Sequence, residues 1–234
     1  MAQIYLVRHG QASFGSQNYD QLSPLGLQQA QHLGRWWAAR ALVPDRVICG
    51  AMMRHQQTAA ACMAELGAGD QGRWQAADAG FNEYNHHEVL ARHMPAFDDP
   101  AAVKHFLLNT VNGKQEFQAI FAAAITRWMS GLHAADYSET WPAFSQRCIA
   151  ALTRQLALAD DAKHIAIFTS GGTISALCQH VLGFPDAKFS ELNWSLVNSG
   201  VTRLHVQPGR LGLAGLNNFS HLEVLNDSRN ITYV

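Results

Sequence analysis

Strand and helix patterns alternate along the chain, and this alternation predicts an α/β protein with a mostly parallel sheet. Two short apolar runs of strand type, Gln3 to Val7 and Pro44 to Cys49, are each followed by a helical pattern. Strands that alternate with helices in this way pair in parallel through right-handed crossovers. From about residue 79 to residue 158 the pattern becomes helical, and a strand pattern then resumes at His164. We therefore expect one domain over residues 1–234 with a helical insertion at about 79–158.

The first helices carry start signals and an apolar face. Ser23 and Pro24 form an N-cap and a first-turn proline, so a helix should begin there. The next helix should run from Ala51 to Leu66 and end at the glycine-rich stretch Gly67 to Gly72. Apolar residues recur at spacings of three and four on one face of the first helix, at Leu27, Ala30, Leu33 and Trp37.

The insertion and the C-terminal part also show apolar patterns and turn signals that predict helices and strands. The apolar series from Phe117 to Leu132 keeps helical spacing without a break, and a second series runs from Phe144 to Leu156. His164 to Thr169 should be a strand, and the helix after it should end at Gly183. Residues 201–216 should form a hairpin around a Pro-Gly turn.

The charge balance excludes a ligand that is attracted by a large net charge of the whole protein. The chain has 234 residues with 17 Lys and Arg, 18 Asp and Glu and 12 His, so charged residues are only 15% of it, against about 25% in an average soluble protein. With a net charge of −1 we expect neither nucleic acid nor a membrane as partner, and a charged ligand must be held by a few local residues. No apolar run reaches the roughly 18 residues of a membrane span. No signal peptide is visible and the four cysteines are widely spaced, so we expect a cytoplasmic protein with reduced thiols.

Polar clusters follow two of the predicted parallel strands. The first is Arg8-His9-Gly10 and the second is Ser170-Gly171-Gly172. Ligands of open parallel sheets bind at the carboxyl ends of the strands, so the two clusters should meet at one edge. A Gly-Gly turn at a helix start exposes backbone N–H groups that suit an anion, and a guanidinium fits phosphate as a planar donor fork. This edge is therefore predicted to be a phosphate site, with a solvated strand end as the alternative.

Five segments of the chain form a series of motifs in a fixed order. They are Leu6-Val7-Arg8-His9-Gly10-Gln11-Ala12, Gln21 to Ala30, Cys49 to Arg54 with Gln57-Thr58-Ala59, Phe81-Asn82-Glu83, and Phe168 to Ile174. Together they resemble the signature of the histidine phosphatase superfamily, also called phosphoglycerate mutase-like, in its branch 1. The resemblance spans nearly the whole chain and implies a three-layer α/β/α sandwich with a mostly parallel central sheet and a helical insertion.

The resemblance also implies a chemistry. His9 would attack phosphorus in line and form a phosphohistidine intermediate, which divides one hard displacement into two easier ones. Arg8 and Arg54 would hold the phosphoryl oxygens and offset charge in the transition state. Glu83 would protonate the leaving oxygen and later take a proton from the attacking water. The resemblance implies no metal and no other cofactor.

The second cluster departs from the family. Ser170 and Gly171 are expected to complete the phosphate site, but at position 170 the family usually has a second histidine that donates to the transferred phosphoryl group. Removing a comparable donor elsewhere costs roughly 10²–10³ in rate. Gly15 also departs, since many members have a substrate-contacting asparagine there. We therefore expect an activity that is slow, specialised or absent.

Other histidines of the chain could replace the missing one. His86 and His87 follow Glu83 within about a turn and are candidates for direct phosphate contact, the alternative being polar residues on an exposed loop. Their spacing does not favour a metal site, because it does not match His-Glu-x-x-His. His55 adjoins Arg54, but neighbours on a helix point in different directions, so we expect His55 to point away from the site.

The predicted function is a phosphatase that hydrolyses a small phosphomonoester through a phosphohistidine on His9. The alternative is a catalytically weak or inactive family member that binds phosphorylated ligands or a protein partner. A phosphoglycerate-type mutase is less favoured, because returning the phosphoryl group to product needs a pocket that excludes water. A serine hydrolase with Ser170 as nucleophile is favoured least, since no Asp and His follow in a suitable context. The substrate and the oligomeric state, a homo-oligomer included, stay open.

Overall fold

A five-stranded sheet forms the centre of the protein. The computed structural model describes residues 2–13, 20–67, 72–159, 161–207 and 209–233. Gly15, Pro208 and the greater part of the glycine-rich stretch after the second helix lie outside these residues. The strand order is β2-β3-β1-β4-β5. The strands are β1 (Ala2–Arg8), β2 (Arg46–Cys49), β3 (His164–Thr169), β4 (Val201–Gln207) and β5 (Arg210–Asn218).

The sheet is mostly parallel, as predicted. β3 pairs in parallel with both β1 and β2. β4 runs against its two neighbours, β1 and β5, so four of the five strands point the same way. β4 and β5 form the predicted hairpin at the edge of the sheet.

The other regular elements of the described residues are α-helices and 3-10 helices. The first begins as predicted at Ser23, whose side chain accepts a hydrogen bond from the N–H of Gly26. The second begins at Met53, later than predicted, and the helix after β3 ends at Gly183 in the left-handed conformation that favours glycine. The α-helices are α1 (Pro24–Ala38), α2 (Met53–Ala64), α3 (His86–His93), α4 (Pro100–Asn109), α5 (Gly113–Met129), α6 (Trp141–Ala157), α7 (Gly171–Leu182), α8 (Phe189–Ser195) and α9 (Ser220–Glu223). The 3-10 helices are η1 (Ala79–Phe81), η2 (Pro95–Asp98), η3 (Ala134–Asp136), η4 (Asp186–Lys188) and η5 (Ser228–Asn230).

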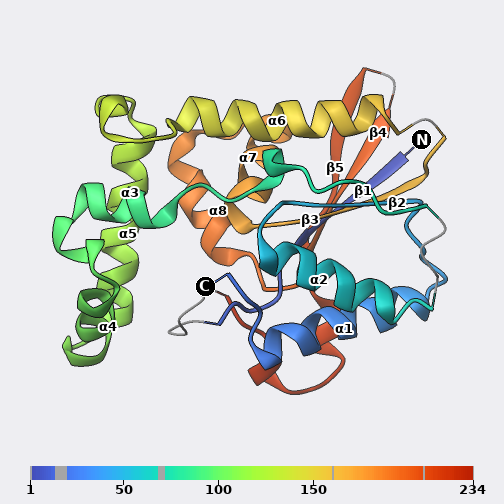
Figure 1. Ribbon diagram of the computed structural model, residues 1–234, viewed down its shortest axis with the longest axis horizontal. Coiled ribbons are helices and arrows are strands. Elements are labelled where there is room, and N and C mark those ends of the chain that lie inside the picture. Colours follow the sequence, from blue (N-terminus) through green and yellow to red (C-terminus); the bar gives the residue numbers. More distant parts are fainter. Residues whose placement is uncertain (1, 14–19, 68–71, 160, 208, 234) are drawn as a thin grey trace.

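Successive side chains of β1 enter two different cores, which makes the protein a three-layer α/β/α sandwich. Side chains alternate between the two faces of a strand. Ile4 and Leu6 pack in a buried apolar cluster with residues of α6 and α7. Tyr5 and Val7 pack in a second cluster with residues of α1 and α2. Figure 1 shows α6 on one side of the sheet and α1 with α2 on the other.

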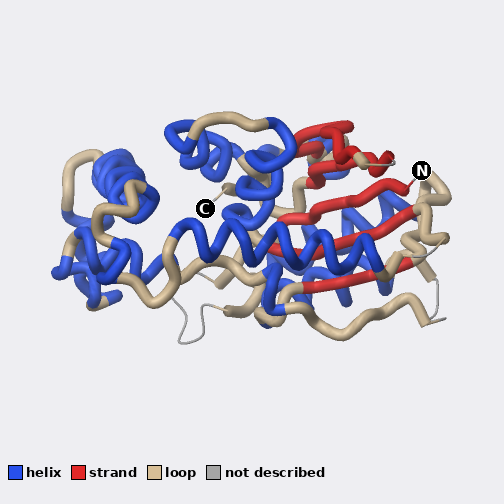
Figure 2. The backbone as a smooth tube through the Cα atoms, turned by 90° about the horizontal axis from the view of Figure 1, so that it is seen from above, coloured by secondary structure: helices blue, strands red, loops and turns tan. Residues whose placement is uncertain are grey.

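The helical insertion extends the fold beyond the end of the sheet. Figures 1 and 2 show α3, α4 and α5 gathered at the end of the molecule away from the N-terminus. The apolar series predicted to reach Leu132 ends sooner, because α5 stops at Met129 and Gly131 adopts a φ of +72°. Leu132 is consequently 84% exposed.

Two further observations concern the class of protein. None of the described helices is both long enough and apolar enough to cross a membrane. The four cysteines are buried and free, as their wide spacing predicted.

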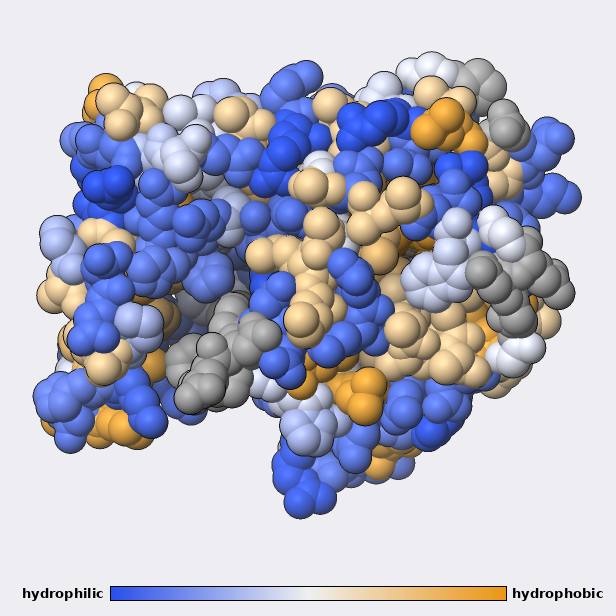
Figure 3. Space-filling view, in the orientation of Figure 1, coloured by the Kyte–Doolittle hydropathy of each residue, from blue (hydrophilic) through white to orange (hydrophobic). Residues whose placement is uncertain are grey.

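The aromatic core of the insertion gives a stability prediction. Trp128 is 2% exposed, its ring centroid lies 5.0 Å from that of Tyr84, and its Nε1 donates to the Glu139 carbonyl over 2.8 Å. Trp128→Ala should lower the free energy of unfolding by about 3–5 kcal/mol in urea titrations, since a large buried ring leaves a cavity. The control is Leu132→Ala, which replaces an exposed side chain and should change the free energy of unfolding by less than about 0.5 kcal/mol. Figure 3 shows that the face of the insertion in view is mostly hydrophilic. Equal effects of the two substitutions would contradict this core.

Candidate active site

The two polar clusters predicted at the sheet edge lie next to each other. In the parallel pairing of β1 with β3, Arg8 lies opposite Thr169. The His9 N–H continues this ladder and donates to the Thr169 carbonyl over 2.8 Å. His9 therefore lies beside the residue that follows β3, Ser170, as the parallel pairing predicted.

The ring of His9 is oriented by a backbone carbonyl. Its Nδ1 lies 2.8 Å from the oxygen of Gly10. Because a carbonyl can only accept, Nδ1 carries the proton and Nε2 of the neutral ring keeps its lone pair. Burial, followed by the positive charges of Arg54 and Arg8, holds the pKa of His9 well below its usual 6.5. At neutral pH His9 is thus an uncharged imidazole whose Nε2 can act as a nucleophile.

Two buried guanidiniums lie near His9. Arg8 donates from Nη1 to the Leu196 carbonyl. Arg54, in the first turn of α2, donates from Nη1 to Oδ1 of Asp20 over 2.8 Å. The other oxygen of Asp20 accepts from the Met53 N–H over 2.8 Å, so one carboxylate both caps α2 and orients Arg54.

Asp20 was missed by the sequence analysis, although a signal was present. It is the first acidic residue of the chain and the only one before Asp45. A lone carboxylate in a polar segment between a strand and a helix is a natural partner for a buried cation.

The side-chain carboxyl of Glu83 lies at the N-terminus of α7. Its Oε2 accepts from the N–H of Gly172 over 3.0 Å, and its Oε1 accepts from the N–H of Tyr84 over 3.2 Å. A Cβ on Gly172 would lie 2.2 Å from Oε1 and 2.5 Å from the Tyr84 ring, so a larger residue there would displace Glu83 or Tyr84. Burial raises the pKa of Glu83 above its ordinary value, although these hydrogen bonds and the two arginines act in the opposite direction. The Gly172 N–H, which was expected to be offered to a ligand, is thus bonded to Glu83.

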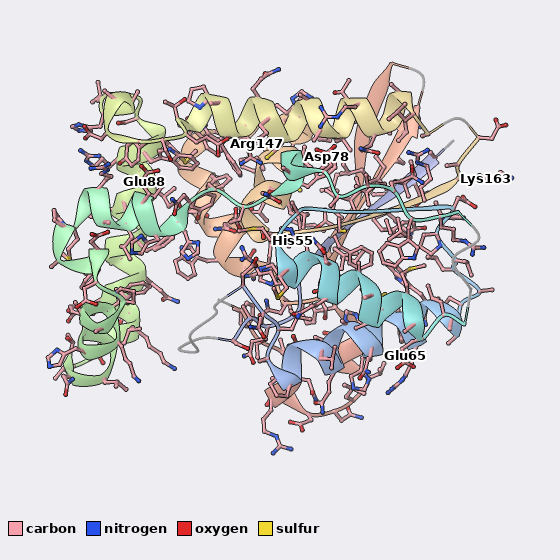
Figure 4. The ribbon with its side chains drawn as sticks, in the orientation of Figure 1. His55, Glu65, Asp78, Glu88, Arg147 and Lys163 are labelled. Atoms are coloured by element: carbon pink, nitrogen blue, oxygen red, sulfur yellow. The ribbon has the colours of Figure 1, made fainter. Side chains whose placement is uncertain are left out.

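The segment that carries Glu83 is fixed from three sides. The Thr169 hydroxyl donates to the Phe81 carbonyl over 2.6 Å, and the Thr173 hydroxyl donates to the Asn82 carbonyl over 3.1 Å. Arg147 of α6 donates to the same Asn82 carbonyl over 3.1 Å (Figure 4). Glu83 is therefore held in place by β3, α7 and α6.

The two histidines that follow Glu83 separate from each other. They begin helix α3 and do not lie on an exposed loop. Burial and then the charge of Arg54 lower the pKa of His86 to about 4, so its half-buried ring is neutral. Nε2 of His87 lies 2.9 Å from the Asp98 carbonyl in η2, and its ring is exposed. Within the described part of the chain, no three potential metal ligands come together.

His55 points into the site, so the prediction that it would point away is wrong. Its Nε2 lies 2.6 Å from Oγ of Ser170, and its ring centroid is 5.8 Å from that of His9. Figure 4 shows His55 at the N-terminal end of α2, beside the strands. The Cα–Cβ bonds of a helix tilt toward its N-terminus. Long side chains of the first turn, here Arg54 and His55, therefore both reach the sheet edge although they differ in direction around the helix axis.

The second cluster is buried under these contacts. Ser170 has no exposed surface, and its hydroxyl is hydrogen-bonded to His55. Gly171 lies against Arg8, since a Cβ there would be 3.5 Å from the Arg8 Nε. The Ser170–His55 pair resembles a nucleophile and its base, but a substrate carbonyl cannot reach a serine that has no exposed surface.

Known proteins share this sequence pattern and this fold. The family profile described as the histidine phosphatase superfamily (branch 1) matches residues 4–105 and 108–219. A search of curated protein sequences finds no relative.

Solved structures with the same fold include phosphatases and a mutase, and at identities of 16–17% the likeness concerns the fold alone. A phosphoserine phosphatase from Entamoeba histolytica is 16% identical with a TM-score of 0.63, over 95% of this chain and 100% of that chain. A phosphoglycerate mutase from Bacillus anthracis is 16% identical with a TM-score of 0.66, over 97% of each chain. A mycobacterial glucosyl-3-phosphoglycerate phosphatase is 17% identical with a TM-score of 0.58, over 93% of this chain and 99% of that chain.

The raised pKa of Glu83 makes the stability of the protein depend on pH. A carboxyl with a higher pKa in the folded state than in the unfolded state opposes folding above that pKa, and this penalty is absent below the ordinary value of 4.5. Glu83→Gln should therefore raise the free energy of unfolding at pH 7.5, and the gain should vanish at pH 4. The exposed Glu116→Gln is the control and should shift it by less than about 0.5 kcal/mol at either pH. A loss of stability at pH 7.5 in Glu83→Gln would contradict the assignment.

Proposed function

The chain belongs to branch 1 of the histidine phosphatase superfamily, and from this premise we propose that it hydrolyses a small phosphomonoester through a phosphohistidine on His9. The observation that carries the proposal is the state of His9. Its ring is neutral, its proton is on Nδ1, and the lone pair of Nε2 remains in a site with two guanidiniums. A neutral imidazole nucleophile and two fixed cations are what in-line attack on a phosphate dianion requires.

The proposed first step transfers the phosphoryl group to the protein. Nε2 of His9 attacks phosphorus, and the bond from phosphorus to the leaving oxygen breaks. Protonated Glu83 gives its proton to that oxygen, so a neutral alcohol departs. Arg8 and Arg54 offset the charge on the phosphoryl oxygens throughout.

The proposed second step returns the protein to its starting state. Water attacks the phosphohistidine, and ionised Glu83 takes the proton of that water. The bond between phosphorus and Nε2 breaks, and its electron pair returns to Nε2. Inorganic phosphate leaves, with Glu83 protonated again.

Two other functions would use the same residues. A weak or inactive member would bind a phosphorylated ligand or a protein partner, and the burial of the Ser170 hydroxyl favours this alternative by removing a donor from the pocket. The less favoured alternative, a phosphoglycerate-type mutase, would return the phosphoryl group to a second position of its substrate, and one solved structure that shares the fold is a phosphoglycerate mutase. Product analysis with 3-phosphoglycerate separates phosphate release from isomerisation.

The proposal is tested with a panel of phosphorylated metabolites. We expect phosphate release from at least one member, together with an acid-labile phosphoryl-enzyme that mass spectrometry after alkaline quenching locates on His9. His9→Ala should lose both, whereas His105→Ala, an exposed histidine of α4, should keep both. Tight binding of phosphate without turnover or phosphoryl-enzyme would favour the binding alternative and would refute the phosphatase.

The pKa directions predict the pH profile of kcat/KM. His9 must be neutral, so the acidic limb should lie well below pH 6.5. Glu83 must be protonated, so activity should fall as pH rises through its raised pKa. Glu83→Gln should abolish this basic limb and lower kcat by about 10²–10⁴-fold for an alkyl phosphate. The loss of kcat should be much smaller for p-nitrophenyl phosphate, whose leaving group needs no proton. A basic limb that persists in Glu83→Gln would show that a group other than Glu83 causes it.

A further inference from the structure

A second buried imidazole stands beside His9, and the reaction steps proposed above do not use it. We propose that His55 is a positioning residue, whose ring holds the His9 imidazole in the orientation for attack and is itself held by Ser170. This inference rests on the proposed function for its kinetic part. Its structural basis is the contact of the two imidazoles, with ring centroids 5.8 Å apart and planes inclined by 34°.

The orientation of His9 needs a second contact. Among the described residues the His9 ring makes one hydrogen bond, from Nδ1 to the Gly10 carbonyl, and this bond fixes one atom but does not by itself fix the tilt of the ring plane. The neighbouring ring of His55 limits this swing. In-line attack depends on the direction of the Nε2 lone pair, so the tilt of the ring plane decides the rate.

His55 is rigid enough for this role. It has no exposed surface, and its Nε2 is 2.6 Å from the Ser170 hydroxyl. Its other nitrogen lies against the backbone of Gly50, where a Cβ would come within 2.2 Å of Nδ1. Any side chain at position 50 would displace the ring, so the glycine there leaves the space that the His55 ring fills.

The proton of His55 is placed by its neighbours. Nδ1 has no hydrogen-bond partner among the described residues and lies against Gly50, so a proton there would be a buried donor without an acceptor. The proton therefore belongs on Nε2, which donates it to Ser170 Oγ. Burial and the charge of Arg54 hold the pKa of His55 well below its usual value. His55 thus stays neutral and acts through His9 instead of exchanging protons with a substrate.

The chain offers a matched control in a second buried histidine–serine pair. Nε2 of His221 lies 2.8 Å from Oγ of Ser199, and both residues are buried. The pair is also near His9, because the Ser199 N–H donates to the His9 carbonyl over 3.2 Å. His221→Ala therefore removes a similar buried contact close to His9 and leaves the His55 ring in place.

The experiment compares His55→Ala with His221→Ala in kcat, KM, affinity for inorganic phosphate and thermal stability. His55→Ala should lower kcat by about 10²-fold. Its affinity for inorganic phosphate, which the arginines provide, should stay nearly unchanged. His221→Ala should lose comparable stability and keep its kcat. Equal losses of kcat in the two variants, or a loss of phosphate affinity that accounts for the effect of His55→Ala, would overturn the proposal.

A reciprocal exchange keeps the proposal testable if His55→Ala is poorly folded. Ser170→His alone should damage the protein, because the Ser170 hydroxyl already touches the His55 ring and leaves no room for a second imidazole. In the double variant His55→Ala, Ser170→His, the new imidazole can fill the space that His55 vacates. We expect the double variant to be more stable than either single variant and to recover most of kcat with no gain in affinity for inorganic phosphate, a gain that a new donor to the phosphoryl group would produce. A double variant no better than His55→Ala would contradict the positioning role.

A readout that needs no turnover separates this inference from the proposed function. The His9 Nδ1–H is protected by the Gly10 carbonyl, and its exchange with solvent can be followed by NMR. Exchange should become faster in His55→Ala and stay slow in His221→Ala. If the wild type hydrolyses nothing but shows this pattern, the proposed function fails and the positioning role stands. Unchanged exchange in folded His55→Ala would refute the positioning role whatever the activity.

Discussion

The pairing of β1 with β3 is the interaction on which the site depends. It sets Arg8 opposite Thr169, and one further backbone bond, from the His9 N–H to the carbonyl of Thr169, extends the pairing one residue beyond the end of β1. This register brings residues far apart in sequence to a single edge. The helix that follows each strand then begins at that edge, so α7 presents its N-terminus to the same place.

Burial converts this meeting point into a chemically specific environment. A charge is costly in a poorly solvated site unless it is paired, so titratable groups become neutral where they can. His9, His55 and His86 have lowered pKa values and Glu83 has a raised one, so each is shifted toward its neutral form. The Arg54 guanidinium is paired with the Asp20 carboxylate. The low overall charge of the chain is therefore compatible with the proposed phosphate site, which needs only a few local cations such as Arg8 and Arg54.

Local sequence patterns and the parallel topology predicted most of the strands and helices. The contacts that side chains make at the N-terminal ends of helices were missed. The alternating strands and helices, the hairpin and the meeting of the two clusters followed from periodicity and strand direction. The orientation of His55 did not, because the angle between neighbours around a helix axis says little about side chains that reach past its first turn. The Gly172 N–H was expected to be open to a ligand, and only the fold shows that the Glu83 carboxyl occupies it. Leu132 lies outside α5 because the helix ends at Met129, before Gly131, whereas the apolar pattern continues to Leu132.

The most direct test concerns the state of His9 in the resting protein. Nitrogen-15 NMR of the imidazoles, with His9 assigned by comparison with His9→Ala, reports both the tautomer and the charge of the ring across a pH titration. The structure predicts a neutral ring with its proton on Nδ1 at pH 7, and still neutral at pH 6.5 and well below, because burial and two guanidiniums oppose protonation. A ring that is half protonated near pH 6.5, or one that carries its single proton on Nε2, would contradict the account.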